Sequence, residues 1–457
     1  MIDPQYIRDN PEELKEWIKK RANPEKANVD RWLELDSKRG GLISRTDELR
    51  RERNELSGKF RDSGEKEKLR AEVNSIKEEL SVLEKELKEV EEEWQEIQYW
   101  IPNLPVDIPD GEGEEDNVIL RLWTPKSGYV EEASGMRADG STKKYMPQNP
   151  YGWNSDKKPV HHQDIGLEMG IIDNVQSAKV SGSRFTYLLG DLVLVQYAVQ
   201  QLMYEKLLGE GFTPLISPLL VKERALYGTS HFPEGRDQVY SIETDYVEDK
   251  EQLHLLGSTE SANFAYFMDR VLDIEKLPIK VFAYAPAFRS EVGSWGKDVK
   301  GIKRVHQFDK IEMNVISHPD NSDKIFNELL EINEWLLQTL KLPYQLAQKC
   351  SGDAGYLASA KQIDPEVWLP GEEEFMEVMT DTNTTDYQAR NLNIKYKDND
   401  GKTKYVHTVN DTGVAMGRIL IAIISNYQTP DGNITVPDAL QKYLGEKKTL
   451  STVDIVK

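Results

Sequence analysis

The most informative segment of the carboxy-terminal body is residues 281–313, VFAYAPAFRSEVGSWGKDVKGIKRVHQFDKIEM. Two runs of alternating apolar and polar residues flank a loop rich in glycine and lysine, with glycines at Gly293, Gly296 and Gly301. Alternation on both sides of such a loop is typical of an antiparallel β-hairpin. The carboxy-terminal body is therefore predicted to contain an antiparallel sheet.

One face of this hairpin is predicted to be charged, because side chains alternate between the two faces of a strand. Arg289 and Glu291 share a face of the first strand. One face of the second strand carries Arg304, His306, Phe308, Lys310 and Glu312, and the other carries Val305, Ile311 and Met313.

A charged face with an aromatic ring in its midst fits a nucleoside triphosphate. Guanidinium groups pair with phosphates, the Phe308 ring stacks on a base, and Glu291 accepts a hydrogen bond from an exocyclic amine. Burying these charges without a ligand would be expensive. The alternative is a solvent-facing strand with cross-strand ion pairs.

Residues 405–428, YVHTVNDTGVAMGRILIAIISNYQ, predict a strand, a tight turn at 410–413 and an apolar helix. Arg418 lies in the first turn of that helix, where the helix dipole disfavours a cation. A bound anion would explain the arginine. The alternative is a capped helix whose arginine reaches solvent.

The amino-terminal 100 residues predict a helical hairpin. Apolar residues with 4,3 spacing in the second helix are Leu69, Val73, Ile76, Leu80, Leu83, Leu87, Val90, Trp94 and Ile97. Leu35, Leu42, Leu49 and Leu56 repeat every seven residues in the first. Turn-forming residues at 60–64 separate the two runs, so we expect an antiparallel coiled coil over about residues 30–99.

Basic residues concentrate on the first helix of this arm, whereas glutamates dominate the second. Arg45, Arg50, Arg51 and Arg53 are the candidates for contact with a phosphate backbone. The alternative is that they are the outer charged positions found in any coiled coil.

Composition limits the remaining possibilities. The 457 residues carry a formal net charge of −21, which disfavours indiscriminate nucleic-acid binding. The single cysteine, Cys350, excludes an internal disulfide and makes a cysteine-based zinc site implausible. No secretory signal or membrane-spanning run is evident, so we expect a cytoplasmic protein with no membrane partner. We expect domains at 1–100 and 118–457, joined by a linker at 101–117 that contains prolines, glycines and acids.

Several motifs together resemble the seryl-tRNA synthetases, a family of class II aminoacyl-tRNA synthetases. They are FRSE at 288–291, RVHQFDKIE at 304–312, GSRF at 182–185, GTSHFPEG at 228–235, EVWLPG at 366–371, TDYQAR at 385–390, and GR at 417–418 with DGNITVPDAL at 431–440. The resemblance covers essentially the whole chain. It implies an α+β fold, an antiparallel-sheet catalytic domain flanked by helices, with an amino-terminal two-helix coiled-coil arm. It also implies a homodimer built partly through residues 211–218.

The chain departs from the family pattern at several positions. The usual Thr-Ala-Glu is Ser258-Thr259-Glu260, and the usual Glu-Val-Ser-Ser-Cys-Ser-Asn is the segment 377–383, EVMTDTN. Asp381 thus stands where the family has cysteine. Asp411 stands where it has glycine, within Asn410-Asp411-Thr412, and we expect Asp411 to adopt a positive φ. Ser425 replaces a glutamate.

The resemblance implies a role for each matching residue. Catalytic residues would be Arg289, Arg418 and Glu312. The ATP-binding set would be Arg289, Ser290, Glu291, Arg304, Val305, His306, Gln307, Phe308, Glu377, Val378, Met379, Thr380 and Arg418. Glu377 and Thr380 would also hold Mg²⁺, and since positions i and i+3 do not share a face of a straight strand, we expect a bulge or strand end there. The serine-binding set would be Ser258, Thr259, Glu260, Arg289, Glu312, Asn410 and Thr412.

The implied activity is ATP-dependent activation of L-serine and its transfer to serine tRNA. Two alternatives remain: a paralogue that activates another small amino acid or loads a carrier protein, and a catalytically inactive coiled-coil scaffold. ATP and Mg²⁺ are the expected cofactors, and no zinc is expected.

Overall fold

The computed structural model describes residues 1–59, 66–150, 153, 156–243, 251–292 and 300–455. The turn expected at 60–64 and most of the glycine-rich loop, at 293–299, lie outside these residues. Contacts divide the chain into two compact units, residues 1–19 with 23–102, and residues 20–22 with 103–457. Part of the predicted linker, residues 103–117, belongs to the second unit, where the Asn103 amide donates to Leu357 O at 2.7 Å. The predicted domain limits stay predictions.

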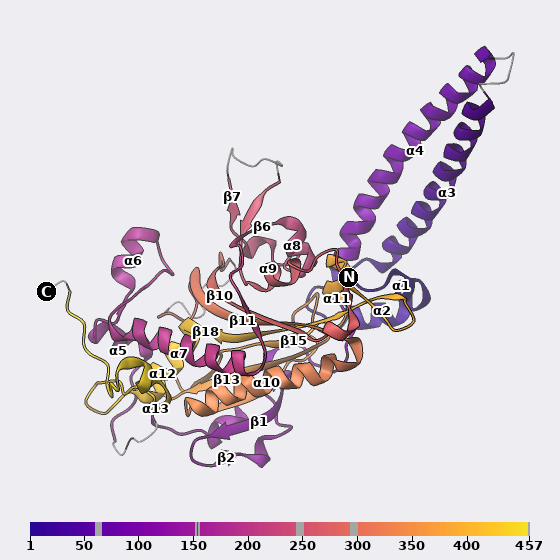
Figure 1. Ribbon diagram of the computed structural model, residues 1–457. Coiled ribbons are helices and arrows are strands. Elements are labelled where there is room, and N and C mark those ends of the chain that lie inside the picture. Colours follow the sequence, from indigo (N-terminus) through magenta and orange to yellow (C-terminus); the bar gives the residue numbers. More distant parts are fainter. Residues whose placement is uncertain (60–65, 151–152, 154–155, 244–250, 293–299, 456–457) are drawn as a thin grey trace. The chain divides into compact units, whose positions relative to one another are not determined.

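The first unit is helical, as the heptads predict. Its helices are α1 (Pro4–Asp9), α2 (Pro11–Ile18), α3 (Val29–Lys59) and α4 (Lys66–Trp100). The long helices α3 and α4 run side by side (Figure 1). Leu49 packs against Ile76 and Leu80 in their seam. Both helices are longer than the heptad run alone predicts.

The second unit is built on a ten-stranded sheet, in the order β2-β1-β12-β13-β15-β18-β11-β10-β5 with β14 paired to β13. Its strands are β1 (Val118–Thr124), β2 (Gly128–Tyr129), β5 (Thr213–Leu215), β10 (Ile279–Phe288), β11 (Gln307–Ser317), β12 (Tyr344–Gln348), β13 (Lys361–Leu369), β14 (Glu374–Glu377), β15 (Asp381–Asn383) and β18 (His407–Ala415). All pairs are antiparallel except β5 with β10. The predicted α+β fold with an antiparallel sheet is confirmed.

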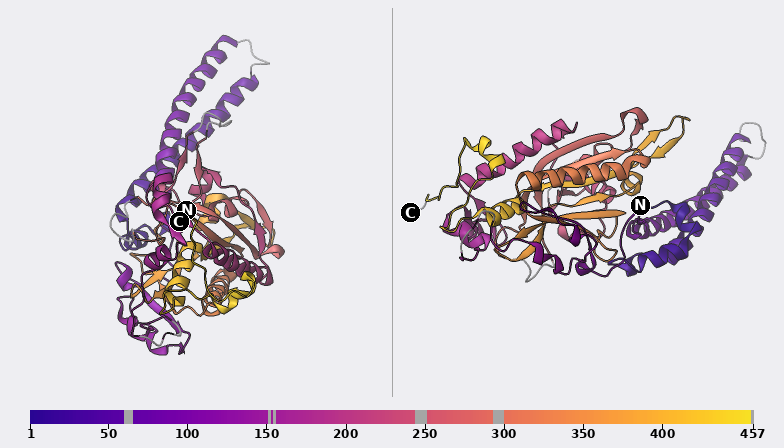
Figure 2. Two further views of the ribbon diagram at one scale, coloured as in Figure 1. Left: turned by 90° about the vertical axis from the view of Figure 1, so that its left-hand side faces the viewer. Right: turned by 90° about the horizontal axis from the view of Figure 1, so that it is seen from below.

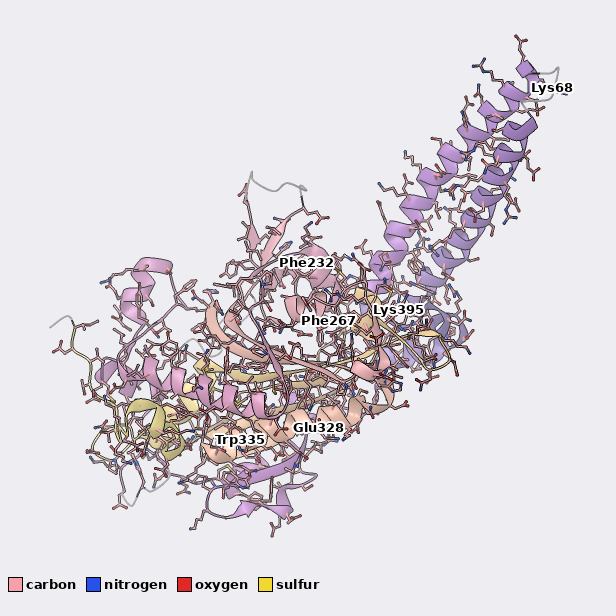
Figure 3. The ribbon with its side chains drawn as sticks, viewed as in Figure 1. Lys68, Phe232, Phe267, Glu328, Trp335 and Lys395 are labelled. Carbon is pink, nitrogen blue, oxygen red and sulfur yellow. The ribbon has the colours of Figure 1, made fainter. Side chains whose placement is uncertain are left out.

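Helices cover both faces of this sheet. The main core lies under α7 (Asp191–Gly209), α10 (Ser322–Thr339) and α12 (Met416–Tyr427). Helix α10 runs along the strands (Figure 2), and Lys280 of β10 donates to Glu328 of α10 at 3.1 Å, the latter labelled in Figure 3. The other face carries α8 (Glu223–Gly228), α9 (Glu260–Ala265) and α11 (Tyr387–Leu392).

Smaller elements complete the unit. They are α5 (His162–Glu168), α6 (Asn174–Ser181) and α13 (Asp438–Gln441), and the short strands β3 (Ile172–Asp173), β4 (Tyr187–Leu188), β6 (Leu220–Lys222), β7 (Ser241–Ile242), β8 (Leu253–Leu255), β9 (Val271–Asp273), β16 (Lys395–Lys397) and β17 (Thr403–Tyr405). Within the described ranges, no helix is long and apolar enough to cross a membrane.

The predicted hairpin is the pair β10–β11, in continuous register from Ile279 opposite Ile316 to Phe288 opposite Gln307. Ile311 and Met313 point into the core under α10, as alternation predicts. The alternation of side chains predicted for the second strand does not extend to residues 304–306, because these residues precede β11.

The tight turn predicted at 410–413 is wrong. These residues lie inside β18, between β11 and β15, which bind the backbone on both sides. Gly413 is skipped in the register, since Ile311 faces Val414 and Glu312 faces Thr412. The glycine therefore forms a β-bulge. The positive φ expected at Asp411 is also wrong, because its backbone is that of a strand.

Candidate active site

A cavity of about 480 Å³ opens on the sheet face opposite α10. Its lining comes from the ends of β10 and β11, from β14, β15 and β18, and from the start of α12. Of the residues predicted to form a site, those that line it are Ser258, Glu260, Arg289, Glu291, Arg304, Val305, Phe308, Glu312, Glu377, Val378, Thr380, Asn410, Thr412 and Arg418. Residues from 258 to 418 of the sequence thus converge on one space.

Arginines and one aromatic ring gather on the hairpin side of the cavity. The Arg289 guanidinium carbon lies 5.5 Å from the centre of the Phe308 ring, and its Nε donates to Gly257 O at 3.2 Å. Arg304 Nε lies 3.6 Å from Glu291 Oε2. Burial, followed by the nearby Arg418, lowers the pKa of Arg289. An anion placed here would relieve the repulsion between the two guanidinium groups.

Arg418 and Glu377 form another part of the lining. The Arg418 Nη1 donates to Glu377 O and to Glu377 Oε1, both at 2.8 Å. Thr380 Oγ1 donates to the same Oε1 at 3.3 Å. Burial alone would raise the pKa of Glu377, but Arg418, Lys349 and Arg289 outweigh it and hold that pKa below its usual range.

The strand end expected between Glu377 and Thr380 is present, because β14 ends at Glu377. That ending lets both oxygen-bearing side chains turn toward one point. Arg418, at the start of α12, forms an ion pair with Glu377 at 2.8 Å. This ion pair explains why a cation is present in the first turn of the helix.

Two buried carboxylates lie at the inner end of the cavity. Lys310 Nζ is 2.5 Å from Glu312 Oε2, and Gln388 Nε2 donates to Glu260 Oε1 at 2.7 Å. Burial raises the pKa of both Glu312 and Glu260. Asn410 Oδ1 is buried in the lining with no hydrogen-bond partner among the described residues. Carboxylates and an open amide oxygen can receive an ammonium group.

Five predicted residues do not line the cavity: Ser290, His306, Gln307, Thr259 and Met379. Ser290 Oγ donates to Asp237 O at 2.5 Å, and the His306 ring packs beside Phe185. Met379 is in the apolar core under α10, because it faces away from Thr380. Their predicted roles came from the family resemblance, and the contacts of Ser290, His306 and Met379 hold these side chains away from the cavity.

Sequence reasoning missed several lining residues. His231 lies 3.9 Å from Glu260 through its Nε2, and burial lowers the pKa of that ring to about 4. Residues 355–359 and Gln388 also line the cavity. The segment 228–235, already singled out as a motif, could have indicated His231, whereas 355–359 carries no recognisable pattern.

Further carboxylates lie behind Glu377. Glu366 is its direct cross-strand partner, and Asp364 lies two residues earlier on β13. Burial, with Glu377 second, raises the pKa of Asp364 to about 7, and burial raises that of Glu366 to about 7. These acids place further negative charge beside Glu377.

A second candidate metal cluster, His161, His162 and Glu372, lies outside this cavity. His161 Nδ1 accepts the Gln163 backbone N–H at 3.1 Å, so its proton is on Nε2. His162 Nε2 is buried without a partner, while its Nδ1 is 2.7 Å from Glu372 Oε1. His162 therefore hydrogen-bonds Glu372, whereas His161 Nε2 lies 3.6 Å from the same carboxylate oxygen.

In the arm, Arg45 and Arg50 pair with glutamates of α4, Glu79 at 2.8 Å and Glu84 at 3.0 Å. Arg53 Nη2 donates weakly to Asn54 at 3.5 Å. Arg51 is exposed and has no ion pair with any residue that the structure describes. Arg51 is therefore the most available of the four candidates for a phosphate.

Two family models match the chain. The seryl-tRNA synthetase N-terminal domain matches residues 1–105, and the class II tRNA synthetase core domain for G, H, P, S and T matches residues 240–427.

Relatives that match nearly the whole chain are named serine–tRNA ligase. A serine–tRNA ligase of Pyrococcus abyssi is 38% identical over 455 residues, which is 98% of this chain and 97% of the relative. One from Thermosipho africanus is 40% identical over 456 residues, with 98% and 99% coverage. The solved seryl-tRNA synthetase of Pyrococcus horikoshii complexed with ATP superposes with a TM-score of 0.84 at 35% identity, covering 99% of this chain and 100% of that one. The chain therefore belongs to the seryl-tRNA synthetase family of class II aminoacyl-tRNA synthetases.

Proposed function

We propose that this protein joins L-serine to serine tRNA in two steps, through a seryl-adenylate made from ATP. The observation that carries the proposal is the single cavity that holds Arg289, Arg304 and Arg418 with Phe308 at one end and the buried Glu312 with Asn410 at the other. The first end suits a nucleoside triphosphate and the second an amino acid. The ATP complex of the Pyrococcus horikoshii relative supports the nucleotide assignment.

Adenylate formation needs no nucleophile from the protein. The serine carboxylate attacks the α-phosphorus, the bond to the β-phosphate oxygen breaks, and pyrophosphate leaves. The protein positions the reactants and neutralises charge. Arg289 contacts the α-phosphate and the serine carboxylate, and Arg304 and Arg418 contact the outer phosphates. Glu291 accepts from the adenine amine, and Phe308 stacks on the base.

Mg²⁺ would be held by Glu377 and Thr380. The Thr380 hydroxyl lies 3.3 Å from Glu377 Oε1, and the acids Asp364 and Glu366 stand behind the pair. Oxygen donors of this kind suit a hard cation. When bound, the ion would neutralise phosphate charge. Arg418 forms an ion pair with the Glu377 carboxylate and would turn toward the phosphates as they enter.

Serine recognition is assigned to Glu312, Asn410 and Thr412. Glu312 receives the ammonium group, and Thr412 with Asn410 meets the side-chain hydroxyl. A site that hydrogen-bonds a hydroxyl rejects alanine, because its own buried polar groups are then unpaired. Threonine is excluded by volume.

The remaining assignments follow the same reasoning. The arm binds serine tRNA through α3, and the protein acts in the cytoplasm as a homodimer. Exposed apolar side chains support the dimer, since Leu194 and Tyr197 of α7 and Ile216 next to β5 face solvent in one chain. Exposed large apolar side chains are common at association surfaces.

The test is an amino-acid panel for exchange of pyrophosphate into ATP. Serine should support exchange, and alanine, glycine and threonine should support about a hundredfold less or none. A faster rate with another amino acid would identify the paralogue alternative. No exchange with any amino acid would identify the inactive scaffold.

A further inference from the structure

The motif GSRF at 182–185, to which the proposed function gives no role, contacts the nucleotide end of the cavity. Arg184 of this motif donates through Nη1 to the backbone oxygen of Glu291 at 3.0 Å, across 107 residues of sequence. Glu291 lines the cavity and is the residue assigned to the adenine amine. The motif therefore bears on the segment that carries base recognition.

Arg184 joins the two sides of the β10–β11 hairpin just past the paired ends of these strands. There the Arg289 amide donates to His306 O at 3.0 Å, and the His306 amide donates to Arg184 O at 3.0 Å. The ring of Phe185 packs beside the His306 ring, with centroids 5.2 Å apart. The Arg184 backbone thus contacts one side of the hairpin, and its side chain contacts Glu291 on the other side.

The backbone of Glu291 has a strained conformation. Its φ is +50°, in the left-handed region that a residue with a Cβ rarely adopts. Such a conformation persists only where the surrounding contacts hold it. On either side, the Ser290 amide donates to Gln238 O and Gln238 Nε2 donates to Val292 O, both at 2.9 Å. Arg184 supplies a contact at Glu291 itself.

The direction of the Glu291 side chain depends on this backbone conformation, because a change of φ swings the Cα–Cβ bond. The side chain is 15% exposed, and its Oε2 lies 3.6 Å from Arg304 Nε. Since Arg304 is assigned to the phosphates, its contact with the carboxylate would be given up when the nucleotide binds. The Arg184 bond goes to the backbone oxygen and does not involve the carboxylate, so it can persist in the nucleotide complex.

We propose that Arg184 is a positioning residue for base recognition, which holds the Glu291 backbone so that the carboxylate points at the exocyclic amine of adenine. The inference rests on the proposed function, in which Glu291 accepts a hydrogen bond from that amine. Inosine triphosphate (ITP) has a carbonyl oxygen in place of the amine, and a carboxylate held beside that oxygen has no donor. Arg184 thus sets the preference for ATP over ITP.

Serine-dependent pyrophosphate exchange with each nucleotide tests this role. In the wild type, kcat/KM for ATP should exceed that for ITP by roughly thirtyfold, as expected for a hydrogen bond to a charged group. Arg184→Met keeps the length of the side chain but removes the donor, and should lower this ratio about tenfold. Arg184→Lys retains a donor and should keep most of the ratio. An unchanged ratio in Arg184→Met would overturn the proposal.

Lys179→Met is the matched control for charge. Lys179 is a nearby cation on α6, and its Nζ donates to Gln176 at 3.3 Å. Removing it should leave the ATP-to-ITP ratio at the wild-type value. An equal loss of the ratio in Lys179→Met and Arg184→Met would show that net charge, and not the bond to Glu291, sets the preference, and would overturn the proposal.

A double variant tests whether Arg184 acts through Glu291. Glu291→Ala should lose the discrimination, and adding Arg184→Met should lower the ratio no further, because both changes act on one hydrogen bond. Additive losses would overturn the positioning role. Discrimination lost in Glu291→Ala but kept in Arg184→Met would overturn the role of Arg184 and leave the proposed function standing. Discrimination kept in Glu291→Ala would refute the assignment of Glu291 to the amine, and the positioning role with it.

Calorimetric titration of the full-length variants with ATP and ITP separates base recognition from a general structural effect. Binding needs no turnover, so it reads the discrimination even where exchange is lost. Arg184→Met should weaken ATP binding about tenfold and leave ITP binding within about threefold of wild type. Equal weakening of both nucleotides is the result of a merely structural role and would overturn the proposal.

Discussion

Arg289 combines contacts that no neighbouring arginine shares. Its guanidinium lies over the Phe308 ring, and its Nε donates a hydrogen bond to Gly257 O. Burial, followed by the nearby Arg418 guanidinium, lowers the pKa of Arg289. A positive charge held this way is ready for a ligand that carries negative charge. Its side chain lines the cavity and contributes nothing to the apolar core.

The variant Arg289→Ala should therefore lose serine-dependent pyrophosphate exchange by about a hundredfold or more, as expected when a charge-stabilising donor is removed. Its circular dichroism and thermal midpoint should remain close to wild type. Arg270→Ala, an exposed arginine on the surface, serves as the control. Exchange that survives within a few fold would refute the bridging role.

Glu312 predicts a pH dependence of serine binding. Burial raises its pKa, with Lys310 opposing, so the protonated fraction is larger than for an ordinary glutamate at low pH. The ammonium group of serine needs the carboxylate. The KM for serine should therefore fall as pH rises through the folded pKa, in steady-state exchange at saturating ATP. Glu312→Gln should raise the KM and remove this pH dependence, and a KM that rises with pH would contradict the assignment.

At the scale of elements, the helical arm and the sheet have separate cores. The α3–α4 seam is built around Leu49, Ile76 and Leu80, and the sheet has its own large core under α7, α10 and α12. Since each of these two cores is built from residues of its own unit, part of the arm should be removable. Replacing residues 36–96 by a short turn should leave pyrophosphate exchange intact and cripple transfer of serine to tRNA. Parallel loss of both activities would contradict this separation.

Within α3, the exposed Arg51 should contribute more to tRNA binding than Arg50, whose side chain is engaged by Glu84 and Asp47. Arg51→Glu should raise the KM for tRNA and reduce its salt dependence by about one unit of logarithmic slope per lost phosphate contact. Lys85→Glu on α4 is the matched control. An equal effect of Arg51→Glu and Lys85→Glu would show that only net charge matters.

At the scale of the whole molecule, Ile216 indicates how the proposed dimer could be disrupted. This side chain is 101% exposed, next to β5 at the edge of the sheet. Ile216→Asp would place a charge in an apolar interface and should shift the protein toward monomer in analytical ultracentrifugation. Val82→Asp, an exposed apolar residue on α4, is the control. A dimer unaffected by Ile216→Asp would locate the interface elsewhere.

Features that depend on local periodicity could be predicted from the amino-acid sequence. The heptads determined the α3–α4 pair, and period-two alternation determined that Phe308, Lys310 and Glu312 face the cavity while Ile311 and Met313 face the core. These patterns suffice because neighbouring residues of one helix or strand set the direction of each side chain. Family motifs then indicated most of the cavity lining, including Arg418 far along the chain.

Features that depend on neighbouring strands could not be predicted from local sequence patterns and became visible in the folded chain. Residues 410–413 have turn-forming side chains, yet β11 and β15 hold their backbone as a strand with a bulge at Gly413. Arg418 meets Glu377, and Asp381 meets Asp411, across distances in sequence that no local pattern spans. The physical reason is that strand pairing and burial set these contacts, and both arise when distant segments pack together.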